Sequence, residues 1–218
     1  MLSENPKFIF IHIPKTAGTS VESYLKLLQK GGCKKHMTIK DYENSLGSSI
    51  SEYFKFTVIR NPWDRMVSYW KYRQGKHWAP IDGTIKNFNV WLKFITALDL
   101  NNLDGSTSTN NISDFRMGID SQYNSLISSN NEINVKLIKF ENLQLDFNDI
   151  CDQIGISRHE LPHINKTNRK HYSSYYDQES QEIISRKYSD DINHFGFTFE
   201  HFNKDSNLND LPARGNFD

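Results

Sequence analysis

The sequence predicts an α/β protein with a mainly parallel sheet flanked by helices. Three short apolar segments, at residues 8–13, 56–59 and 135–140, have the composition of strands that are covered on both faces. A stretch with helical spacing of apolar side chains follows each segment. The chain has 218 residues, of which 37% are hydrophobic, which is enough to bury a core. We therefore expect a single domain over residues 1–202 and a polar tail over residues 203–218.

The charge and cysteine content exclude several classes of protein. Lys and Arg together number 26, as do Asp and Glu, so no overall field attracts a polyanion and nucleic acid is not an expected partner. Cys33 and Cys151 are too few for a disulfide framework or a cysteine zinc site. No run is long enough to span a membrane, and the apolar run from Phe8 is too short for a signal peptide. We expect a cytoplasmic chain that holds any anionic ligand by a local cluster of donors.

The first strand and its helix are separated by a tight loop. The strand at residues 8–13 ends before Pro14, and Thr19 or Ser20 is the expected N-cap of the helix that follows. A glycine pair at residues 31–32 ends that helix. Its apolar face consists of Val21, Tyr24, Leu25 and Leu28.

The second strand, at residues 56–59, ends at Arg60 and leads into another helix. Asn61 is the expected N-cap, Pro62 the first helical residue, and Asp64 an acid in the first turn. The helix is expected to continue to about Arg73.

The rest of the chain continues the alternation. Residues 88–95 show a helical apolar face, and residues 101–114 form a polar loop. The strand at residues 135–140 precedes a helix that ends at Gly155, and a single helix is expected over residues 178–193.

The loop from Pro14 to Ser20 is a candidate anion site. A loop between a buried strand and a helix directs backbone N–H groups and the positive end of the helix dipole at one point. Lys15 adds a charge, Gly18 permits close approach of the backbone, and hydroxyl donors come from Thr16, Thr19 and Ser20. The order of a Walker A loop is absent, so no magnesium ligand is assigned. The alternative is an ordinary turn with a solvated lysine.

Arg60 marks a second candidate anion site, at the carboxyl end of the second strand, where ligands bind in open α/β sheets. Its guanidinium can hold a phosphate through two hydrogen bonds. Ser68 shares a helical face with Arg65 and could reach the same anion. The alternative is a surface ion pair for Arg60 and an ordinary helical serine. Two such sites together indicate a ligand with two separated anionic groups.

Both segments resemble motifs of the carbohydrate (Golgi-type) sulfotransferase family. Residues 12–20, HIPKTAGTS, look like its 5′-phosphosulfate-binding motif, and residues 59–68, IRNPWDRMVS, look like its 3′-phosphate-binding motif. Residues 140–147, 161–166 and 191–197 resemble later segments of the same family, so the likeness runs from about Phe8 to Phe199.

The resemblance implies a P-loop-like three-layer α/β/α sandwich and a metal-independent reaction. It implies 3′-phosphoadenosine 5′-phosphosulfate (PAPS) as donor, adenosine 3′,5′-bisphosphate (PAP) as product, and a hydroxyl acceptor on a saccharide or glycoconjugate. The 5′ end of the donor would be held by Lys15, Thr16, Ala17, Gly18, Thr19 and Ser20. Arg60 and Ser68 would hold the 3′-phosphate. The basic stretch that contains Lys166 and Thr167 resembles a late loop that folds over the nucleotide.

Sulfuryl transfer to a hydroxyl needs a base, and histidine suits this role near neutral pH. We assign His36, because the family has a histidine-containing loop between the two motifs. His77 and His163 are the alternatives, whereas His12 lies in a buried run and is expected to be structural. Lys15 is the second catalytic group, which stabilises charge on the departing oxygen.

An aromatic cluster near the second motif suits a sugar, although core packing is the better explanation for each ring taken singly. It consists of Trp63, Tyr69, Trp70, Tyr72 and Trp78. Two other functions stay open at this point. A nucleotide kinase or NTPase would need a Walker A order and an acidic magnesium ligand. A noncatalytic nucleotide-binding or glycan-binding module would need no base.

Overall fold

The computed structural model describes residues 1–26, 36–76, 82–98, 115–162 and 169–201. The chain divides into two compact units. The first comprises Met1–Arg60, Gln122–Lys166 and Asn203–Asp218, and the second comprises Asn61–Ser121 and Thr167–Phe202. The single domain over residues 1–202 stays a prediction.

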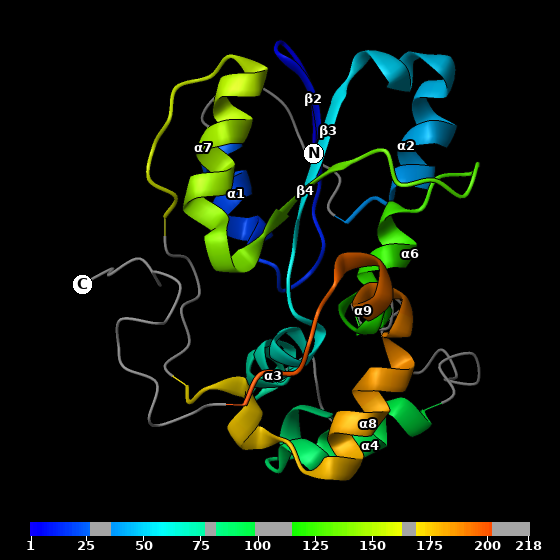
Figure 1. The fold of residues 1–218 in the computed structure, drawn as a ribbon, viewed down its shortest axis with the longest axis vertical. Coiled ribbons are helices and arrows are strands. Elements are labelled where there is room, and N and C mark those ends of the chain that lie inside the picture. The colour runs from blue at the N-terminus through cyan, green and yellow to red at the C-terminus, as the bar shows by residue number, and fades with distance from the viewer. Residues whose placement is uncertain (27–35, 77–81, 99–114, 163–168, 202–218) are drawn as a thin grey trace. The chain divides into compact units, whose positions relative to one another are not determined.

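The first unit contains a four-stranded sheet in the order β1-β2-β3-β4 (Figure 1). The strands are β1 (Leu2–Glu4), β2 (Lys7–Ile11), β3 (Phe54–Ile59) and β4 (Lys136–Lys139). β2, β3 and β4 are parallel, and β1 pairs antiparallel with β2. The three predicted strands and the mainly parallel sheet are therefore confirmed. β1 was not predicted, because three residues are too few to show periodicity.

Helices cover both faces of this sheet (Figure 1). On one face, α1 (Gly18–Leu25) and α7 (Leu143–Ile154) pack on apolar side chains of the strands, among them Phe10, Phe56 and Ile138. On the other lie α2 (Ile39–Leu46) and α6 (Gln122–Leu126). The short 3₁₀ helices Gly47–Glu52 and Phe140–Asn142 precede β3 and α7. Gly155 ends α7 in the left-handed conformation, as predicted.

The second unit is helical. It contains α3 (Pro62–Arg73), α4 (Phe88–Ala97), α8 (Gln178–Lys187) and α9 (Ser189–Phe195), with 3₁₀ turns at Asp82–Thr84 and Tyr172–Tyr175. The bounds of α3 and its N-cap are as predicted, since the Asn61 side chain accepts hydrogen bonds from the Trp63 and Asp64 backbones.

The prediction of a single helix over residues 178–193 is wrong, because the chain forms α8 and α9 instead. Tyr188, between them, has φ −113° and ψ 31°. Its buried hydroxyl donates to the Ile119 carbonyl at 2.7 Å. The next residues, Ser189 and Asp190, are types that favour a helix start over a helix interior. The apolar periodicity continues through this break, so the periodicity gave no sign that the helix ends there.

Candidate functional site

The loop between β2 and α1 has an unusual backbone. Lys15 and Ala17 have positive φ values of 69° and 70°, and Thr16, between them, does not. Ala17, left-handed at φ 70° and ψ 13°, directly precedes the right-handed helix α1, and such a pair of conformations turns successive N–H groups toward one point and forms an anion-binding concavity. The loop expected to bind an anion therefore has the backbone geometry of an anion site.

Helix α1 begins two or three residues earlier than predicted. Its N-cap is Ala17, and not Thr19 or Ser20 as expected. The alanine methyl group cannot accept a hydrogen bond, so no side chain at the cap competes for the N–H groups that begin the helix. The positive end of the α1 dipole thus adds to the concavity.

The predicted hydroxyl donors differ in their surroundings. Thr16 is fully buried, and its hydroxyl donates to the Ile13 carbonyl at 2.9 Å, which closes the loop from within. Thr19 is exposed at the first turn of α1, and Ser20 is buried. In this conformation Thr16 offers the anion its backbone and not its hydroxyl.

Gly18 is required by the packing of this loop. A Cβ at Gly18 would lie 2.0 Å from Cδ2 and 2.3 Å from Nε2 of the His12 ring. His12 is buried, and its Nδ1 lies 2.9 Å from Oε1 of the buried Glu22 in α1. Glu22 thus anchors the ring on which the loop rests. The expected structural role of His12 agrees with this position.

The carboxyl group of Glu22 is held in its ionised form. Burial raises the pKa of Glu22. The hydrogen bond and charge of His12, together with the charge of Lys26, lower the pKa by more than burial raises it, to about 2. A buried carboxylate paired with a histidine therefore lies beneath the anion loop, and no sequence motif pointed to it.

His36 lies against His12. Its Nδ1 is 3.0 Å from the His12 carbonyl oxygen, and the two rings lie 4.6 Å apart. A carbonyl can only accept, so Nδ1 carries the proton that is donated, and the basic lone pair of the neutral ring lies on Nε2. The structure therefore places the predicted base beside the loop that precedes α1. His77 and His163 lie outside the described residues.

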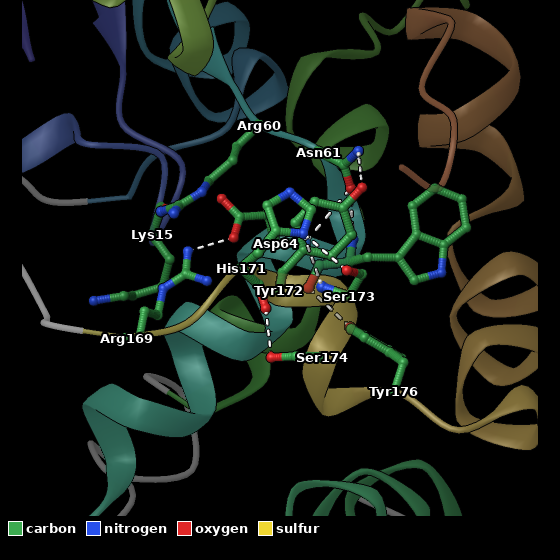
Figure 2. Close-up of polar contacts among 11 residues, drawn as sticks. Lys15, Arg60, Asn61, Asp64, Arg169, His171, Tyr172, Ser173, Ser174 and Tyr176 are labelled. Carbon is green, nitrogen blue, oxygen red and sulfur yellow. Dashed lines mark hydrogen bonds and ion pairs between the residues drawn. The ribbon is translucent and has the colours of Figure 1, made fainter. Parts of the chain in front are cut away.

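Arg60 lies next to the anion loop, at the same edge of the sheet. Ile11 pairs with Thr57 across β2 and β3, so the residues after both strands meet there. Nη1 of Arg60 donates to the Lys15 carbonyl at 2.9 Å (Figure 2). Its Cζ lies 3.8 Å from the centre of the Phe140 ring. The sequence predicted Arg60 as an anion ligand but missed its contacts with Lys15 and Phe140.

The backbone of Arg60 is also fixed. The side-chain amide of Gln122 accepts from the Arg60 N–H at 2.9 Å and donates to the Arg60 carbonyl at 2.8 Å. Gln122 is fully buried at the start of α6. This pairing resembles a further rung of a sheet, and it holds the chain at the point where β3 ends.

Ser68 belongs to the second unit, where it is buried in α3. Arg65, predicted on the same face, is fully buried and donates to the carbonyls of Gly118 and Asp120. Arg65 therefore ties α3 to residues 115–121. The role of Ser68 toward a 3′-phosphate stays a prediction.

The basic stretch after residue 165 is described only from Arg169 onward, so Lys166 and Thr167 lie outside the described residues. Arg169 forms an ion pair with Asp64 in the first turn of α3, and their side chains are 13% and 14% exposed (Figure 2). The Tyr176 hydroxyl donates to the Trp63 carbonyl at 2.8 Å, which holds the following turn on α3. The Asp64–Arg169 pair was not predicted, since 105 residues separate its members.

Most of the aromatic side chains proposed for a sugar acceptor pack inside the second unit. Trp63, Tyr69 and Trp70 are at most 5% exposed, whereas Tyr72 is 36% exposed. The Trp70 ring contacts Phe88 edge to face. Core packing accounts for the three buried rings, and Trp78 lies outside the described residues.

The family comparison identifies a sulfotransferase. A sequence model described as "Sulfotransferase family" matches residues 1–198. A search of curated proteins and a search of solved structures gave no match. None of the helices within the described ranges is long and apolar enough to cross a membrane.

Proposed function

Because the chain belongs to the sulfotransferase family, which makes it a sulfuryl-transfer enzyme, we propose that PAPS is its donor and a saccharide hydroxyl its acceptor. The observation that carries the donor assignment is the loop with alternating φ values at Lys15 and Ala17. This loop suits the 5′-phosphosulfate, because it combines converging N–H groups, a helix N-terminus and a lysine. The saccharide acceptor rests on the resemblance to carbohydrate sulfotransferases.

The donor would contact three parts of the chain. Residues 15–20 would hold its 5′ end through backbone N–H groups, the Lys15 ammonium and the exposed hydroxyl of Thr19. Arg60 and Ser68 would hold the 3′-phosphate. Lys166 and Thr167 would lie over the nucleotide. Two such anion sites would suit the 5′ and 3′ phosphate positions of PAPS, whereas ATP has no 3′-phosphate.

The proposed reaction is an in-line displacement at sulfur. PAPS supplies an activated sulfuryl group, and PAP leaves as the bond between sulfur and the bridging oxygen breaks. His36 Nε2 takes the proton of the acceptor hydroxyl as its oxygen bonds to sulfur. Lys15 stabilises the charge that develops on the bridging oxygen. No step in this account uses a metal. A cytoplasmic location stays a prediction.

Transfer of labelled sulfate from PAPS tests the proposal. The purified chain should sulfate at least one member of a panel of glycans, glycolipids and small alcohols, and Lys15→Ala should lose that activity. Arg158→Ala is a matched control, because it removes an exposed cation that pairs with Asp152. Tight binding of PAP without transfer to any acceptor would favour the noncatalytic module instead.

A further inference from the structure

Arg60 is held in place before any ligand arrives. Gln122 fixes both backbone groups of Arg60, at 2.9 and 2.8 Å, and the Phe140 ring covers the guanidinium at 3.8 Å. Arg60 itself is only 6% exposed. A side chain whose backbone is hydrogen-bonded and whose one face is covered by a ring loses little conformational freedom when it binds a partner.

The partner within reach is the anion loop. Nη1 of Arg60 donates to the carbonyl of Lys15, the first residue of the loop with positive φ. A non-glycine residue in this conformation is strained and persists only where its surroundings fix it. A charged donor on its carbonyl supplies such a constraint, because it fixes the peptide plane that links Lys15 to Thr16. That same plane carries the Thr16 N–H, one of the backbone groups proposed to bind the 5′ end of the donor.

We infer that Arg60 is a positioning residue for the 5′ loop, and that Phe140 holds it in that role. Arg60 thus acts on the 5′ end of the donor through Lys15, in addition to its proposed contact with the 3′-phosphate. A guanidinium has five N–H donors, so both tasks are compatible. The inference rests on the proposed function, since it concerns the same donor. Arg60 would therefore contact the 3′-phosphate and hold the 5′ loop from one fixed position.

Ligands that lack the 3′-phosphate separate the two roles. Titration calorimetry would give Kd values of PAP and of adenosine 5′-monophosphate (AMP) for the wild type, Arg60→Ala, Arg60→Lys and Phe140→Leu. Lysine keeps the charge but lacks the planar guanidinium, which lies on Phe140 while its Nη1 reaches the Lys15 carbonyl. Arg158→Ala serves as the control for removal of a cation from the first unit. Circular dichroism would show that each variant is folded at the temperature of measurement.

The inference predicts weaker AMP binding in both Arg60 variants, by about tenfold, the usual worth of a charged hydrogen bond. Phe140→Leu should weaken AMP binding in the same direction by a few-fold, although Phe140 is not assigned to the ligand. Arg158→Ala should leave the affinity for AMP unchanged.

Two results would overturn the inference. If Arg60→Ala and Arg60→Lys weaken PAP binding but leave the AMP affinity at the wild-type value, Arg60 serves the 3′-phosphate alone and the proposed function stands. If the wild type binds neither PAP nor AMP, the proposed donor and the inference fail together.

Discussion

Replacement of Gly18 by alanine is expected to destabilise the first unit through His12. The new Cβ would lie 2.0 Å from Cδ2 of the ring, where ordinary contacts begin near 3.4 Å. The ring or the helix must therefore retreat by roughly 1.4 Å. The ring cannot yield easily, because Oε1 of the buried Glu22 lies 2.9 Å from its Nδ1. Overpacking together with a loosened buried pair should lower the free energy of unfolding by about 2–4 kcal/mol.

A double-mutant cycle tests this reasoning. Urea unfolding would compare Gly18→Ala in the wild type with Gly18→Ala in a background that carries His12→Ala and Glu22→Gln. The background removes the ring without leaving a buried carboxylate alone. There the alanine should be neutral or stabilising by about 0.5 kcal/mol, because alanine favours a helix over glycine. An equal loss in both backgrounds would refute the clash with His12 as the cause.

Three further predictions concern the charged groups of the site. His36→Ala should keep its affinity for PAP and lose sulfate transfer by roughly 10²–10⁴-fold in single-turnover assays, the usual effect of removing a base. Wild-type activity should fall at acid pH as the imidazole is protonated. Near-normal turnover in His36→Ala would transfer the role of base to His77 or His163. Lys15→Ala should weaken PAP binding and also slow single turnover at saturating donor, whereas a change in affinity alone would remove its catalytic role. The pKa of Glu22 is about 2, below its ordinary 4.5. The ionised carboxylate therefore stabilises the fold above pH 4.5, and this stabilisation is lost as the pH falls toward 2. In urea unfolding, the free energy of unfolding of Glu22→Gln should fall less than that of the wild type over this pH range.

Much of the fold followed from local patterns in the sequence. The three parallel strands are apolar runs that alternate with helices, and Asn61-Pro62 is a strong local signal for the start of α3. The position of Arg60 at the carboxyl end of its strand, where ligands bind in open α/β sheets, also followed.

The features that escaped prediction depend on tertiary contacts or on unusual backbone. Lysine and alanine rarely adopt positive φ, so nothing in the sequence indicated the alternation at Lys15 and Ala17. Gly18 was expected to make room for a ligand, and its nearest neighbour is the His12 ring. The Glu22 side chain faces inward from an amphipathic helix, where a buried carboxylate is not anticipated without knowledge of its partner.

The most direct test of the proposed donor compares two nucleotides by thermal unfolding. PAP at about one hundred times its Kd should stabilise the protein by about 2.7 kcal/mol, which corresponds to a rise in Tm of roughly 5–10 °C. ATP with Mg²⁺ at the same concentration should shift the Tm much less, because it lacks the 3′-phosphate assigned to Arg60 and Ser68. Equal shifts from PAP and ATP would contradict the assignment of PAPS as the donor.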